Sequence, residues 1–221
     1  MKKVLFCIMV LFVACQSSQN AQQDKQACAY AQKEENLETW EEYLESFPKG
    51  ECSFEARSKI RKLKKEREEE EKKAAYQRER KIGHLIWSDR SSNEVDWSTA
   101  KEYCENLTEG GFADWRLPNI DELRTIIKNC FKTETSGECK LSEKSGCLSS
   151  NCWQPKGICY CDGRSNNGGY YSKLGDDDNV WLWSSTQLDY SDFALTVNFK
   201  NGSVGPSLRN FGRNVRCVRN Y

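Results

Sequence analysis

The stretch GFADWRLPNIDELRTII, residues 111–127, decides the fold of the C-terminal part of this chain. It runs from a Gly-Gly turn through a Trp-Arg-Leu strand end into the start of a helix. Asn119 is a favourable N-cap, and Glu122 three residues later completes a capping box. The sequence therefore predicts a helix that starts at Asn119 and directs Leu123, Ile126 and Ile127 inward.

Upstream of this stretch, VDWSTAKEYCENL at residues 95–107 predicts another helix. Asp96 or Ser98 can cap its first turn, because both side chains accept hydrogen bonds from free backbone amides. Ala100, Cys104 and Leu107 recur at helical spacing and predict the buried face.

Strand patterns surround the two helices. HLIWSD at residues 84–89 predicts an opening strand, and VWLWSST (180–186), FALTVNFK (193–200) and NVRCVRN (214–220) predict later ones. Asn201-Gly202 lies between alternating runs, which is a strong hairpin signal. Helices followed by an antiparallel sheet predict an α+β domain over residues 83–221.

Composition limits the function. Of 221 residues, 30% are charged and 38% are hydrophobic, so part of the chain cannot be core. Lys and Arg total 33, as do Asp and Glu, and residues 83–221 contain 16 basic and 18 acidic side chains. Without a basic excess we expect no binding to nucleic acid.

The N-terminus predicts export. KKVLFCIMVLFVAC, residues 2–15, has two lysines and then an apolar run shorter than the roughly 20 residues that span a bilayer, so residues 1–14 are expected to be a signal peptide. LFVAC resembles the lipobox of bacterial lipoproteins, which implies that Cys15 is lipidated. Gln16 rather than Asp follows it, an outer-membrane sorting context. The alternative is a signal peptide that is cleaved elsewhere.

A flexible tether is expected at residues 15–24, followed by helices. Residues 25–65 predict a helical hairpin, because Trp40, Tyr43, Leu44 and Phe47 share one helical face before Pro48 and Gly50. Cys28 and Cys52 are placed to staple this hairpin, and its pattern resembles short tetratricopeptide-like repeats. Residues 66–82 predict a charged helical linker. The charged run from Arg57 to Lys81 predicts ion pairs between residues four apart: Lys62 with Glu66, Glu68 with Lys72, and Glu69 with Lys73.

Cysteine is abundant. Of 12 cysteines, removing Cys7 with the signal and Cys15 for lipid leaves an even ten, which in an oxidising compartment predicts five disulfides. A zinc site is the alternative for part of the central group. Against it, Cys159 and Cys161 are separated by only one residue, which is cramped for tetrahedral coordination. Six central cysteines are expected to be disulfide staples of unknown pairing: Cys130, Cys139, Cys147, Cys152, Cys159 and Cys161.

WSTAKEYCENLTEGGFADWRLPNIDELRTII, LWSST, ALTVNFKNGSV and the terminal RNVRCVR together resemble the Lcl C-terminal domain family, over residues 83–221. The resemblance implies a C-type lectin-like fold with two helices, an antiparallel sheet and long loops, in which the N- and C-terminal strands pair. It also implies a disulfide between Cys104 and Cys217. Members of the family are mostly uncharacterised surface or periplasmic proteins, and the one that gives the family its name adheres to host polysaccharide.

Catalytic patterns are weak. His84 is the one histidine, and Ser184 and Ser185 lack a nucleophile-elbow context, so we expect no enzyme. The E-P-N, Q-P-D and W-N-D motifs of calcium-dependent lectins are missing. The run GDDDN at 175–179 keeps calcium as an alternative to the expected absence of a cofactor.

Aromatic residues of the central loops are the remaining candidates. Trp153, Tyr160, Tyr170 and Tyr171 are expected to contact a glycan or protein ligand, or alternatively to form a small core for the loops. The expected function is non-catalytic recognition or adhesion by a lipid-anchored envelope protein. The alternative is a structural or assembly lipoprotein that contacts another envelope protein.

Overall fold

The computed structural model describes residues 2–152, 159–161, 171–175, 180–188 and 192–221, with side chains from Ser18 onward. The chain divides into two compact units, Met1–Lys72 and Lys73–Tyr221. In the described part of the chain, none of the helices has an apolar stretch long enough to traverse a bilayer.

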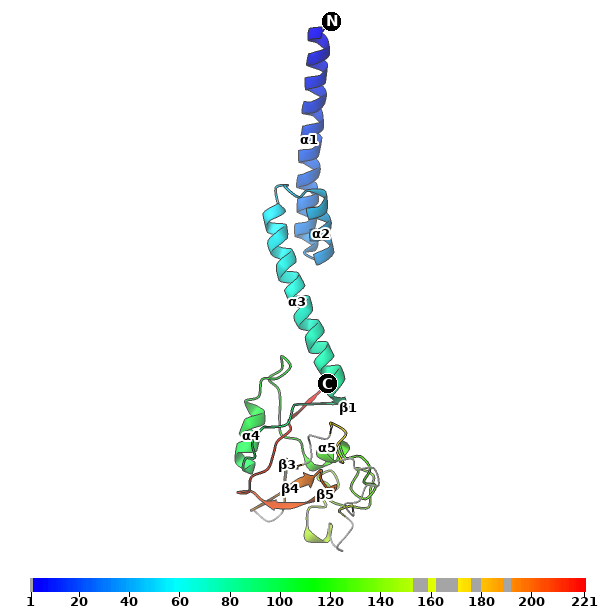
Figure 1. Cartoon of the computed structure of the whole chain (residues 1–221), viewed down its shortest axis with the longest axis vertical. Coiled ribbons are helices and arrows are strands. Elements are labelled where there is room, and N and C mark those ends of the chain that lie inside the picture. The colour runs from blue at the N-terminus through cyan, green and yellow to red at the C-terminus, as the bar shows by residue number, and fades with distance from the viewer. Residues whose placement is uncertain (1, 153–158, 162–170, 176–179, 189–191) are drawn as a thin grey trace. The chain divides into compact units, whose positions relative to one another are not determined.

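The first unit is helical (Figure 1). It contains α1 (Lys2–Glu34), α2 (Leu37–Ser46) and the first part of α3 (Ser53–Arg80). Asn36 caps α2 by accepting a hydrogen bond from the Thr39 amide at 3.0 Å. Trp40 and Tyr43 are buried, and the predicted Cys28–Cys52 disulfide joins α1 to the start of α3.

Tyr43 on α2 links α1 to the segment just before α3. Its hydroxyl donates to Asp24 Oδ1 at 2.6 Å and accepts from the Cys52 amide at 2.9 Å. Burial, followed by the hydrogen bond to Asp24, raises the pKa of Tyr43 to about 12.

Two expectations about the N-terminal half differ from the structure. Residues 16–24, expected to be flexible, are helical, because this segment has no Gly or Pro and several good helix formers. Of the predicted ion pairs, Lys62 with Glu66 is present at 3.7 Å, whereas Glu69 pairs with Lys65.

The second unit begins at Lys73, ten residues before the predicted boundary at Gly83. The Tyr76 ring packs edge-on against Trp115 at 6.4 Å between centroids, and its hydroxyl donates to Glu109. Burial, followed by that hydrogen bond, raises the pKa of Tyr76. Lys73 Nζ lies 4.3 Å from the centroid of the Phe112 ring. The last turns of α3 are therefore part of the C-terminal domain.

Two antiparallel three-stranded sheets form the frame of this domain (Figure 1). In the first, the opening strand pairs with the last one: Leu85 lies opposite Asn220, and Trp87 opposite Val218. In the second, Asn201-Gly202 makes the predicted hairpin, with Gly202 at a φ of 64°. Pro206 lies on the edge strand, where a missing amide donor is tolerated. The strands are β1 (Lys81–Ile82), β2 (Leu85–Trp87) and β6 (Val218–Asn220), in the order β1-β2-β6, and β3 (Trp181–Gln187), β4 (Phe193–Asn198) and β5 (Ser203–Leu208), in the order β3-β4-β5.

The last strand is shorter than the predicted 214–220. Before Val218, the chain pairs with residues 88–91 partly through serine hydroxyls: the Cys217 amide donates to Ser88 Oγ at 2.8 Å, and the Val215 amide to Ser91 Oγ at 2.9 Å. Side-chain oxygens thus replace the carbonyls of a regular ladder.

The helices α4 (Trp97–Glu105) and α5 (Ile120–Thr125) start as predicted, with Asp96 and Asn119 as caps and the complete capping box at Glu122. Leu123 on α5, and Ile126 and Ile127 just after it, are fully buried in one core cluster with residues of β4. A second cluster contains Trp97, Trp115 and Trp183 around the Cys104–Cys217 disulfide, which the resemblance implied.

Candidate functional site

The chain after α5 is held by three disulfides. They pair Cys130 with Cys161, Cys139 with Cys159, and Cys147 with Cys152, the last in a short 3-10 turn, η1 (Ser150–Cys152). All six central cysteines are therefore staples, as predicted, and their sulfurs do not serve as zinc thiolates. Within the described residues, no group of three or more His, Cys, Asp or Glu side chains is gathered for a metal ion.

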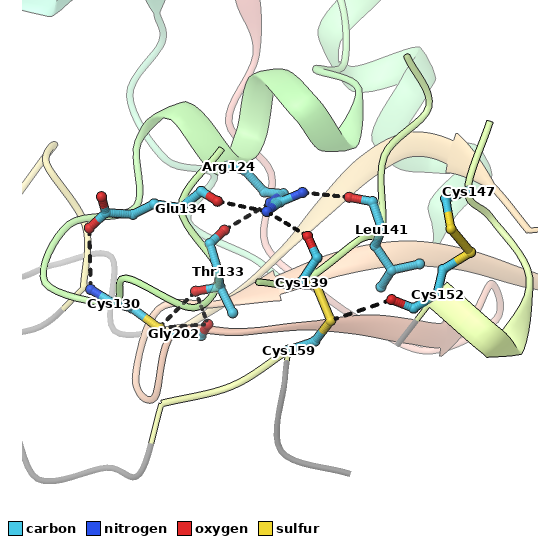
Figure 2. Close-up of a disulfide and its surroundings, with 10 residues drawn as sticks. All are labelled: Arg124, Cys130, Thr133, Glu134, Cys139, Leu141, Cys147, Cys152, Cys159 and Gly202. Atoms are coloured by element: carbon cyan, nitrogen blue, oxygen red, sulfur yellow. Dashed lines mark hydrogen bonds between the residues drawn. A yellow bond between two sulfur atoms is a disulfide. The ribbon is translucent and has the colours of Figure 1, made fainter. Parts of the chain in front are cut away.

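Arg124 organises the same loops from inside. Its side chain is on α5 and only 2% exposed, and four backbone carbonyls surround the guanidinium group (Figure 2). Burial lowers the pKa of Arg124, although an arginine remains protonated. The guanidinium thus satisfies carbonyls that would otherwise be buried without donors. The distances are 2.8 Å to the oxygen of Thr133, 2.6 Å to Glu134, 3.1 Å to Cys139 and 2.5 Å to Leu141.

The inner side of the loops rests on the turn between β4 and β5. Thr133 Oγ1 donates to the Gly202 carbonyl at 2.7 Å, and the Val204 amide donates to the Cys159 carbonyl at 2.9 Å. A Cβ at Gly202 would lie 3.0 Å from Cys130 Sγ, so a larger residue would push the loop away from the turn. The Asn-Gly pair therefore makes the hairpin and also receives the loop.

The outer side of the loops presents aromatic rings. Phe131 is 70% exposed and Tyr160 is 41% exposed, and Lys132 Nζ lies 6.0 Å from the centroid of the Tyr160 ring. Phe131 and Tyr160 each adjoin one cysteine of the Cys130–Cys161 disulfide, whose Cα atoms are 5.8 Å apart. Phe131, Lys132 and Tyr160 make up the aromatic face. Because a disulfide cross-links the backbone of this face, we expect binding to cost little conformational entropy of the loops.

The predicted ligand contacts separate into three groups. Tyr160 is exposed, as a contact requires. Tyr171 is only 4% exposed and packs in the main core, so its assignment as a ligand contact is wrong. The Tyr171 amide donates to the Phe199 carbonyl at 3.1 Å, and this backbone bond holds the residue against the core. Trp153 and Tyr170 lie outside the described residues, as do the aspartates of GDDDN.

Sequence reasoning missed Phe131 and Arg124. Phe131 is a lone aromatic in the polar run KNCFKTETSGEC, which was a usable signal for an exposed ring. Arg124 is four residues after Ile120 and three before Ile127, on the buried face of the helix. A charged residue at that position indicates a buried polar network.

The family model described as the Lcl C-terminal domain matches residues 80–219. No curated protein matches the chain.

Proposed function

Because this chain belongs to the Lcl C-terminal domain family, we propose that it is an exported, lipid-anchored envelope protein whose C-terminal domain binds a glycan or protein ligand without catalysis. The observation that carries the proposal is the aromatic face, where Phe131 and Tyr160 are exposed and each is next in sequence to one cysteine of the same disulfide. Exposed rings on a rigid loop suit recognition, because they give large contact areas at small entropic cost.

The proposed fold of the domain is C-type lectin-like. Two features support it: β2, near the start of the domain, pairs with the last strand, β6, and Cys104 on α4 bonds Cys217 next to β6. In such a fold the long loops carry recognition, and here these are the disulfide-stapled loops.

Five disulfides support the proposal of export, because a reducing cytosol would not keep them. Cys15 is the proposed lipidation site, because LFVAC resembles a lipobox. Two or more acyl chains would hold the protein on a membrane, at about 0.8 kcal/mol for each buried methylene.

The lipid anchor predicts a fractionation result. Cys15→Ala should move the protein from the membrane pellet to the soluble fraction of the envelope, or leave it unprocessed, whereas Cys7→Ala should not change the fractionation. Immunoblots of cell fractions, with palmitate labelling, measure the outcome. A Cys15→Ala protein that still takes up palmitate would contradict the assignment.

The second candidate function is structural, with the helical hairpin as the contact surface. Its specific support is the exposure of Tyr30 at 56% and Phe54 at 83% on the first unit, since solvated aromatic rings mark partner surfaces. A tetratricopeptide-like hairpin, which the sequence pattern suggests, would suit that role.

Alanine variants of the two surfaces distinguish these functions. Phe131→Ala with Tyr160→Ala should weaken ligand binding by about 30-fold or more, because even one buried aromatic anchor contributes about 2 kcal/mol. Tyr30→Ala with Phe54→Ala is the matched control, which removes two exposed rings from the hairpin. Glycan arrays and envelope pull-downs with the full chain measure both pairs.

If only the hairpin variants lose their partner, the structural function holds and the proposed binding role of the aromatic face fails. Loss confined to the Phe131 and Tyr160 variants supports ligand recognition by the loops. Thermal unfolding of each variant confirms that a lost interaction is not a folding defect.

A further inference from the structure

A cavity of about 470 Å³ lies in the second unit, apart from the aromatic face. Ligand sites commonly have roughly 300–1,000 Å³, so it can hold a small molecule. Among the described residues, its lining combines four basic, two acidic and two aliphatic side chains. They are Arg80, Lys81, Lys173 and Arg216, then Glu79 and Asp89, then Ile82 and Leu174.

The charge of this lining differs from that of the domain. Residues 73–221 contain 20 basic and 19 acidic side chains, whereas the described part of the lining has four basic and two acidic ones. A local positive excess in a nearly neutral domain concentrates anions at this place, because a concave wall focuses the field.

Arg80 is already committed to other groups. Its guanidinium bonds Asp89 Oδ1 at 2.9 Å and lies 4.3 Å from the centroid of the Tyr76 ring. Arg80 also lies 3.5 Å from Glu79 Oε2, so it pairs with both acids of the described lining. The other cations of that lining are Lys81, Lys173 and Arg216.

These three cations come from separate segments of the chain. Arg216 is only 4% exposed and donates to the Ser88 carbonyl at 2.6 Å, so its position is fixed. Lys173 Nζ donates to the Thr125 carbonyl at 2.7 Å, and Lys81 Nζ lies over the Tyr221 ring at 3.2 Å from the centroid. Since an ammonium has three donors, both lysines can keep these contacts and also bind a ligand.

We infer that the cavity lined by Lys81, Lys173 and Arg216 binds a phosphate monoester. A phosphate monoester has three strong acceptor oxygens and close to two negative charges, which suits a wall with several cations better than a carboxylate does. The cavity is larger than one phosphate, and Ile82 and Leu174 offer apolar contact to the body of the ester. Two sources have this chemistry: a soluble sugar phosphate and the terminal glycerol 3-phosphate monoester of a phosphatidic acid lipid.

Calorimetric titration of the full chain in detergent tests the site with four probes: inorganic phosphate, glucose 6-phosphate, glycerol 3-phosphate and glucose. We expect saturable one-to-one binding of the esters and none of glucose. Tighter binding of glucose 6-phosphate would identify a sugar phosphate as the source, and tighter binding of glycerol 3-phosphate a lipid headgroup.

Charge-removing variants locate the binding. Lys81→Met and Lys173→Met should each weaken ester binding by about tenfold, the usual value of a hydrogen bond to a charged group. Lys200→Met, which removes an exposed lysine outside this lining, should leave it unchanged. Near-UV circular dichroism checks the fold, and Lys81→Met keeps the test decisive if Lys173→Met does not fold, because the Lys81 side chain is exposed.

The inference is overturned if no ester binds at millimolar concentration, or if the wild type and both lining variants bind the ester equally. Equal heats from glucose and glucose 6-phosphate would overturn it as well. Equal weakening in the Lys200→Met variant would also overturn it, because it would indicate a general charge effect. The aromatic-face variants should bind the ester normally, so failure of this site and failure of the proposed ligand face remain distinguishable.

Discussion

The double variant Cys104→Ala/Cys217→Ala should lose about 4–5 kcal/mol of unfolding free energy. Among the disulfides of the described residues, this one closes the longest loop, with a sequence separation of 113. In the chain-entropy account, the cross-link stabilises by restricting the unfolded chain, and the effect grows with the logarithm of loop length. The Cys130–Cys161 bond shortens the effective loop, which reduces the effect by only a few tenths of a kcal/mol.

The matched control is Cys147→Ala/Cys152→Ala, whose disulfide has a separation of 5. The same relation gives it about 2 kcal/mol, so the two double variants should differ by nearly 3 kcal/mol. Urea unfolding with the other four disulfides intact measures both. Equal losses would show that packing around the sulfurs, rather than loop closure, sets their contribution.

Local signals explain the parts of the fold that the sequence predicts well. The caps at Asp96 and Asn119 depend on one side chain and an amide three residues away, and both are present. The hairpin at Asn201-Gly202 is local in the same sense, because the turn itself requires a positive φ at Gly202.

Long-range contacts decide the parts that the sequence predicts poorly. The domain begins at Lys73 because Tyr76 finds Trp115 and Glu109, residues far along the chain, whereas the charged pattern around it is typical of a solvated linker. The ladder before Val218 is irregular because Ser88 and Ser91 supply acceptors from the opposite end of the domain.

For the same reason, the sequence predicts the candidate site only in part. Six cysteines permit 15 pairings, and no local pattern selects the observed one. Tyr160 and Tyr171 both lie in loop-like sequence, yet one is exposed and the other fills the core beside Cys130 and the β4–β5 turn. Burial of a loop aromatic depends on where the loop is folded back, which its own sequence does not encode.

Arg124→Met should destabilise the stapled loops by about 3–5 kcal/mol. Methionine keeps most of the side-chain volume and removes the desolvation cost of the charge, which alone would favour the variant. Against this, four carbonyls lose their donor, and they belong to the backbone, so the variant cannot remove them. Each unsatisfied buried acceptor costs about 1–3 kcal/mol, and the loss therefore exceeds the gain.

The effect of Arg124→Met should be local, because the disulfides and the β3-β4-β5 sheet remain in place. We expect faster amide hydrogen exchange at residues 133–147 and a lower unfolding temperature, with exchange in β4 changed far less. Arg124→Lys should be intermediate, since an ammonium keeps the charge but cannot spread its three donors over four carbonyls.

Arg116→Met is the control on the same segment. It breaks the ion pair of Arg116 with Glu122 at 2.6 Å, in which the arginine side chain is 44% exposed, and it should cost about 1 kcal/mol or less. If Arg124→Met unfolds at the same temperature as the wild type and leaves exchange at residues 133–147 unchanged, the disulfides alone hold these loops and the guanidinium is dispensable. If it is as mild as Arg116→Met, the carbonyls have found other donors, and the arginine does not organise the loop that carries Phe131 and Tyr160.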